Sequence, residues 1–147
     1  MFKVKTHPEI AMDKLMRMAG DLDDIADAGS VRADAIDELS GDLGIAREKL
    51  YAALALSQAE LTLEHPVQFV VCTGGCQGYG ALECVRELLD IREDKLESEE
   101  PSFDVVPRPC LNRCQDAPVV ELRSPDGSAV LGSATPARVA DAVSEIF

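Results

Sequence analysis

Two short cysteine loops are the part of this sequence whose residue types could do chemistry. Three residues separate Cys72 from Cys76, three separate Cys110 from Cys114, and 33 residues lie between the two loops. Each loop follows an apolar run that is typical of a β-strand. Two such loops can bring four thiolates together, and four thiolates are the usual ligands of a 2Fe-2S cluster. We therefore expect these four cysteines to be cluster ligands.

The first cysteine loop is unusually rich in glycine. Four glycines fall within seven residues, namely Gly74, Gly75, Gly78 and Gly80. A flexible turn needs only one or two glycines. Glycine also lets the backbone approach a bulky inorganic group and offer N–H donors to its sulfurs. The glycine content therefore favours a cluster-binding loop.

The fifth cysteine and the two histidines are weaker candidates. Cys84 lies in a segment with helical periodicity, residues 81–91, and we expect it to be a small buried side chain. The rival assignment exchanges Cys84 for Cys76 as a ligand. Neither His7 nor His65 lies in a cysteine loop, which argues against a Rieske-type centre with two histidine ligands.

Two other chemistries stay open for the same cysteines. Four thiolates also suit tetrahedral zinc in a protein-interaction module, although zinc loops usually have two residues between cysteines and need no glycine loop. A dithiol oxidoreductase could use Cys72 and Cys76, but its usual spacing is two residues and Cys110 and Cys114 would have no role. The spacing favours the electron carrier over both alternatives.

Composition limits the classes of partner and the location. The 147 residues are 46% hydrophobic, which is enough for a packed core. The net charge of −13, from 14 Lys and Arg against 27 Asp and Glu, argues against nucleic acid and predicts a partner with a basic face. No apolar run approaches the roughly 18 residues of a membrane-spanning helix, and the N-terminus lacks the apolar core of a signal peptide. We expect a cytoplasmic protein.

The first part of the chain predicts a small helical bundle. Apolar periodicity predicts helices over residues 7–20, 31–43 and 46–61. The capping-box spacing of Thr6 and Glu9 indicates the first start, and Gly44 can cap the end of the second helix. A unit this small buries little surface, so we expect it to pack on the rest of the chain or on a partner.

The second part predicts an α/β domain. Its expected elements are strands at 67–71, 103–106, 119–122 and 129–131, and helices at 81–91 and from residue 135 to the end, with a solvated connection at 92–100. This order gives a parallel βαβ unit extended by an antiparallel hairpin. The predicted fold is a helical docking domain, residues 1–63, followed by a thioredoxin-like (βαβ-ββ-α) ferredoxin domain, residues 64–147.

Several motifs resemble those of a known family. They are Cys76-Gln-Gly-Tyr-Gly80, Cys110-Leu-Asn-Arg-Cys114-Gln-Asp-Ala-Pro118, Pro125-Asp-Gly127, Gly132 and Pro136, with a looser helical stretch from Ala35 to Tyr51. The second half looks like the thioredoxin-like 2Fe-2S ferredoxins, and the whole chain resembles the 2Fe-2S subunit of NADH dehydrogenases of the complex I type. The glycine four residues after Cys76, which Cys84 lacks, favours Cys76 as the ligand.

The resemblance implies an electron-transfer chain rather than a catalytic one. That family also serves NAD-linked formate dehydrogenases and hydrogenases. The implied cofactor is one 2Fe-2S cluster, and the implied partner is a flavin-containing, NADH-oxidising subunit or another redox protein with a basic face. The sequence has no dinucleotide-binding fingerprint, so we do not expect the chain to bind NADH itself. A homodimer is a further expectation.

Overall fold

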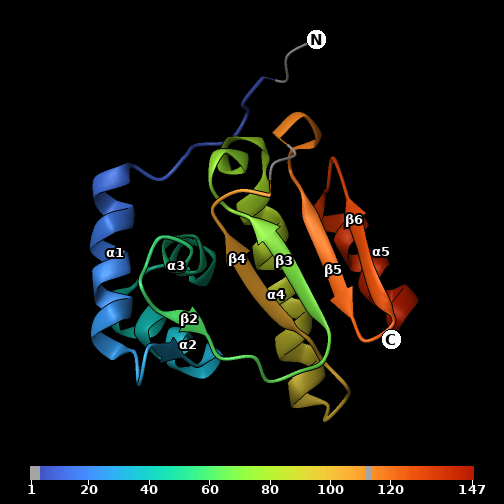
Figure 1. Ribbon diagram of the computed structural model, residues 1–147, viewed down its shortest axis with the longest axis horizontal. Coiled ribbons are helices and arrows are strands. Elements are labelled where there is room, and N and C mark those ends of the chain that lie inside the picture. The colour runs from blue at the N-terminus through green and yellow to red at the C-terminus, as the bar shows by residue number, and fades with distance from the viewer. Residues whose placement is uncertain (1–3, 112–113) are drawn as a thin grey trace.

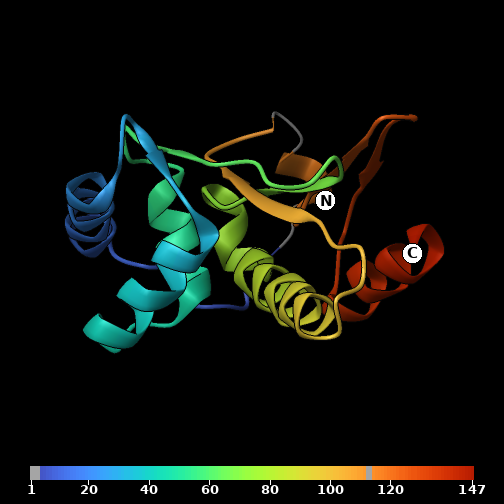
Figure 2. The same ribbon diagram turned by 90° about the horizontal axis from the view of Figure 1, so that it is seen from below.

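The computed structural model describes residues 4–111 and 114–147. Figure 1 shows three N-terminal helices beside one edge of a sheet, with two further helices behind the sheet. In Figure 2, which is seen from below, α4 (Ala81–Glu97) and α5 (Pro136–Ile146) lie on one face of that sheet. Thr135 caps α5 by accepting a hydrogen bond from the N–H of Arg138, and Pro136 occupies the first turn of this helix.

The sheet has the predicted thioredoxin-like layout. Its strands are β3 (Gln68–Cys72), β4 (Asp104–Arg108), β5 (Val120–Ser124) and β6 (Gly127–Leu131). They lie in the order β4-β3-β5-β6, with β3 parallel to β4 and antiparallel to β5. The antiparallel pairing of β5 with β6, which form a hairpin, completes the sheet. The predicted α/β fold, N-terminal helices followed by a mixed four-stranded sheet with helices, is therefore confirmed.

The three predicted N-terminal helices are present, but each has different bounds, and the second begins two residues later than predicted because Val31 lies in a short strand. They are α1 (Met12–Ile25), α2 (Ala33–Leu43) and α3 (Arg47–Leu54). The second ends at Gly44 in the left-handed conformation, φ 65°, as predicted. The first does not begin at the capping-box residues, because the N–H groups of Thr6 and His7 donate to the carbonyl of Gly78 instead.

The helix α3 is shorter than the periodicity predicts. A carboxylate oxygen of Asp23, on α1, accepts hydrogen bonds from the N–H groups of Gln58 and Ala59, at 3.0 and 3.2 Å. This tertiary contact turns the chain away from the helical path after Leu54. The chain then forms β2 (Glu60–Leu61), which pairs in parallel with β1 (Ser30–Val31), a pairing with no sequence signal.

The helix α4 is longer than predicted, because the expected solvated connection at 92–100 is helical as far as Glu97. Arg92 accounts for the difference. Its side chain is buried, its Nε donates to the carbonyl of Phe103 at 2.8 Å, and its guanidinium lies 3.8 Å from the carboxylate of Asp104. A charged residue that the sequence places in solvent is thus paired in the core.

One hydrophobic core runs through both parts of the chain. Its buried side chains extend from Leu15 on α1 to Val143 on α5.

The predicted division of the chain into two domains, between residues 63 and 64, stays a prediction. In the part of the chain that the structure describes, no helix is both long enough and apolar enough to span a bilayer.

Candidate functional site

The first cysteine loop begins where β3 ends. Cys72 is the last residue of β3, and its N–H donates to the carbonyl of Val119. The chain then enters a 3₁₀ helix, η1 (Gly75–Tyr79), where the sequence predicts an irregular loop, and this turn carries Cys76. Both cysteines are buried, with exposed fractions of 3% and 2%. Gly80 ends the turn at φ 106° and leads into α4, so the glycine is needed for the left-handed backbone.

The two cysteine loops touch each other through their backbones. Strands β3 and β4 are parallel neighbours, so their carboxyl ends meet at one edge of the sheet. Thr73 donates its N–H to the carbonyl of Arg108 at 2.8 Å. A Cβ atom on Gly74 would overlap the carbonyl oxygen of Pro109, so only glycine fits this approach.

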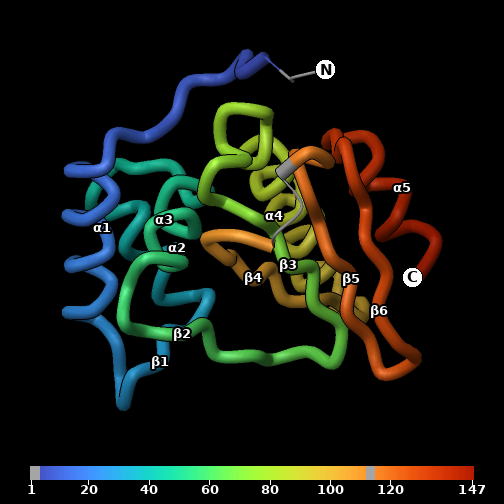
Figure 3. Tube along the Cα trace, turned by 45° about the horizontal axis from the view of Figure 1, so that its top comes forward, coloured from blue at the N-terminus to red at the C-terminus, as the bar shows by residue number. Residues whose placement is uncertain are grey.

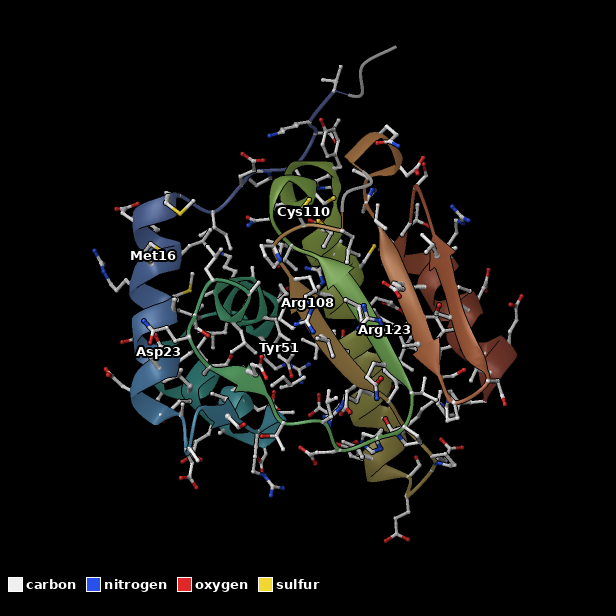
Figure 4. The ribbon with its side chains drawn as sticks, in the orientation of Figure 1. Met16, Asp23, Tyr51, Arg108, Cys110 and Arg123 are labelled. Atoms are coloured by element: carbon white, nitrogen blue, oxygen red, sulfur yellow. The ribbon has the colours of Figure 1, made fainter. Side chains whose placement is uncertain are left out.

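The sulfur of Cys72 lies where the two loops meet. In the thiol form it donates to the carbonyl of Pro109 over 3.7 Å, and backbone N–H groups of Gly74, Cys76 and Leu111 also reach it. Pro109 and Leu111 are the two neighbours of Cys110 in the sequence. Cys110 itself is exposed, and Figure 4 shows it at the end of the sheet, above Arg108.

The surroundings of Cys72 favour its thiolate. The hydrogen bond from Cys76 is the main cause that lowers the pKa of Cys72 from 9.0 to about 6, and burial opposes the shift. Backbone N–H donors lower the pKa further. The thiolate is the form that binds metals and attacks disulfides. Cys72 is therefore prepared for either chemistry near neutral pH.

Cys84 has the opposite environment. It is fully buried on α4, as the sequence predicts, and burial raises the pKa of its thiol to about 12, with help from Glu83 and Glu87. It therefore stays protonated at neutral pH. Its ligand role relative to Cys76 stays a matter of prediction, but its chemistry suits packing.

Cys114 lies on a second 3₁₀ turn, η2 (Cys114–Asp116), and its side chain is outside the described part of the structure. Its role as a ligand therefore stays a prediction. Among the side chains that the structure describes, which do not include that of Cys114, no group of three or more His, Cys, Asp or Glu is arranged to hold a single metal ion. The donor chemistry nevertheless fits a cluster, because Cys72 favours the thiolate and the glycine contact brings the Cys110 loop beside it.

Sequence reasoning missed one buried residue in the loop. Gln77 has an exposed fraction of 4%, its Nε2 donates to the carbonyl of Thr73, and its Oε1 accepts from the N–H of Ile10. A polar residue directly after Cys76 in a glycine-rich loop was the available signal.

A groove of about 360 Å³ lies between the first cysteine loop and helices α1 and α3.

Comparison with known proteins gives a distant structural likeness. No family model matches the chain, and no curated protein matches it either. Among solved structures, it is similar to a thioredoxin-like [2Fe-2S] ferredoxin from Aquifex aeolicus, with 24% sequence identity and a TM-score of 0.46. The match covers 56% of this chain and 85% of the ferredoxin chain.

Proposed function

We propose that the chain is a one-electron carrier that holds a 2Fe-2S cluster through Cys72, Cys76, Cys110 and Cys114. The supporting observation is the sulfur of Cys72, which lies against its own loop and against the backbone on both sides of Cys110. When bound, such a cluster accepts and releases one electron at a time.

The residues of the chain have distinct roles in this proposal. Cys72 supplies a thiolate at neutral pH because of its lowered pKa. The buried positions of Cys72 and Cys76 keep water from one side of the site, and backbone N–H groups donate to the sulfur. Cys110 is exposed, so its side of the site is where a partner would make contact.

Metal analysis of protein purified without oxygen tests the proposal. We expect a red-brown protein with about two iron and two sulfide per chain. Dithionite reduction should then give the EPR signal of a reduced four-thiolate cluster. Colourless protein that carries about one zinc and no sulfide would instead support the zinc-stabilised interaction module.

A dithiol oxidoreductase is the second candidate, because the low pKa of Cys72 and the hydrogen bond from Cys76 also suit disulfide exchange. This function predicts that iron-free protein reduces disulfides of a test substrate and that Cys110→Ser has no effect on the rate. The electron carrier predicts that Cys110→Ser abolishes or visibly changes the absorption and EPR of the cluster. The two functions therefore differ in their dependence on Cys110.

The proposed partner is a flavin-containing, NADH-oxidising protein with a basic face, as in an NADH dehydrogenase, formate dehydrogenase or hydrogenase. The net charge of −13 and the resemblance of the cysteine motifs support this choice.

We expect NADH to reduce the chain only when such a flavoprotein is present. The rate of this flavoprotein-dependent reduction should fall as salt shortens the Debye length from about 10 Å at 0.1 M to about 3 Å at 1 M. Direct reduction of the chain by NADH would count against this partner. A partner-dependent rate that does not change with salt concentration would count against it too.

A further inference from the structure

The side chain of Gln77 connects two segments that are far apart in the sequence. Its Nε2 donates to the carbonyl of Thr73 at 2.7 Å, which closes the loop between Cys72 and Cys76. Its Oε1 accepts from the N–H of Ile10 at 3.0 Å, across 67 positions of sequence. Gln77 is almost fully buried, the bond to Thr73 is buried with it, and the bond to Ile10 is partly buried. Buried hydrogen bonds of this kind are costly to break.

Residues 5–10 lie along the turn that carries Cys76, and we call them the N-terminal strap. The N–H groups of Thr6 and His7 donate to the carbonyl of Gly78 at 2.9 and 3.1 Å. The Nδ1 of His7 lies 3.2 Å from a carboxylate oxygen of Glu83, on α4. Figure 3 shows this segment, in dark blue, passing along the outside of the turn. With the bond to Ile10, the strap is fixed at both of its ends.

We propose that Gln77 is a positioning residue that holds the Cys72–Cys76 loop closed and fastens the N-terminal strap over it. The strap then limits access of water and reagents to Cys76. The effect on a bound cluster rests on the proposed function. The effect on the thiols does not, because it follows from hydrogen bonds within the chain alone.

Thiol alkylation of the reduced, metal-free full chain tests the proposal directly. Buried thiols react only through local opening, so their rates report how firmly each segment is held. We expect Gln77→Leu to raise the alkylation rate of Cys76, followed by mass spectrometry, about three- to tenfold, which corresponds to the net loss of a hydrogen bond. Cys84, buried in α4, should keep its wild-type rate.

Two further variants separate the parts of the proposal. Ile10→Pro removes the N–H that Gln77 accepts but leaves the bond to Thr73, and it should also raise the rate at Cys76. Gln68→Leu is the matched control, because the Nε2 of Gln68 makes a similar bond, to the carbonyl of His65, at the opposite end of β3. It should leave Cys76 unchanged.

In iron-loaded protein, Gln77→Leu should shift the EPR g-values, while Gln68→Leu should not.

An unchanged alkylation rate at Cys76 in Gln77→Leu would overturn the proposal. An equal rise at Cys76 and Cys84 would overturn it too, because it would indicate general loosening of the fold. A wild-type rate in Ile10→Pro would overturn the role of the strap. Protein without iron and sulfide would refute the proposed function, and the alkylation rates would still decide this inference.

Discussion

At the scale of single residues, the described cysteines differ in what reaches their sulfurs. Cys72 is contacted by the thiol of Cys76 and by backbone N–H groups of both loops, and its pKa falls to about 6. Cys84 is surrounded by apolar atoms and two nearby carboxylates, and its pKa rises to about 12. The same side chain is therefore a prepared thiolate in one place and an inert packing group in the other.

The first prediction at this scale concerns the ligands. Cys72→Ser, Cys76→Ser, Cys110→Ser and Cys114→Ser should each abolish or visibly change the absorption and EPR of the cluster, because oxygen is a harder ligand than thiolate. Cys84→Ser should leave the spectrum unchanged and lower the free energy of unfolding by about 1 kcal/mol. If Cys84→Ser bleaches the protein while Cys76→Ser does not, the assignment of these two residues is reversed.

The second prediction concerns pH. The pKa of Cys72 is about 6 in the folded chain and near 9.0 when unfolded, so folding favours the thiolate. Its contribution to stability is fully present above pH 9, decreases as the pH falls toward 6, and is absent below that. Denaturant titrations of reduced, metal-free protein between pH 6 and pH 9 should show the free energy of unfolding rising with pH. Cys72→Ser should remove most of this slope, and an unchanged slope would contradict the prediction.

At the scale of elements, the site depends on how β3 and β4 end. The two strands are parallel and in register, with Cys72 paired to Arg108, so the following residues leave the sheet side by side. Gly74 then passes directly against the carbonyl of Pro109. The contact between the loops is therefore a consequence of strand register and of one missing side chain.

The prediction at this scale is that Gly74→Ala separates the loops. The added methyl group would need space that the carbonyl of Pro109 occupies, so the free energy of unfolding should fall by about 1–3 kcal/mol. The iron content of the purified protein should fall with it. Gly75→Ala is the matched control, because a Cβ there meets no atom within 4 Å. Equal iron content in the two variants would show that the loop contact is not needed.

At the scale of the whole molecule, Asp104 fastens the connection between β2 and β3 to the sheet and to α4. It is buried at the start of β4, and one carboxylate oxygen accepts from the N–H groups of Glu64 and His65 at 2.8 and 2.9 Å. The other oxygen faces the buried guanidinium of Arg92. These contacts lie where the expected boundary between the two domains falls.

The prediction for this contact is that Asp104→Asn lowers the free energy of unfolding by about 3 kcal/mol, because it leaves the charge of Arg92 buried without a counter-charge. Thermal or denaturant unfolding followed by circular dichroism measures the loss. Asp34→Asn is the control, since the carboxylate of Asp34 pairs with Arg32 at the surface and such pairs contribute less than about 1 kcal/mol. Similar losses in both variants would contradict the buried ion pair.

Local sequence signals were enough to predict the order and type of the elements in the sheet half of the chain. Apolar runs bounded by proline, glycine and charged residues predict the strands, and helical periodicity predicts the helices between them. The apolar runs that precede the cysteines predict that each cysteine pair lies at the end of a strand. These signals can be read without knowing which segments come together.

Other features depend on distant contacts, and the folded structure was needed to find them. The strap is extended because the carbonyl of Gly78 accepts its N–H groups. The helix α3 ends early because Asp23 accepts the N–H groups of residues 58 and 59. The helix α4 continues because Arg92 pairs with Asp104 at the start of β4. The burial of Gln77 and the contact of Gly74 with Pro109 have the same origin. Each depends on partners about 10 to 70 positions apart in the chain, and local periodicity carries no information about such pairs.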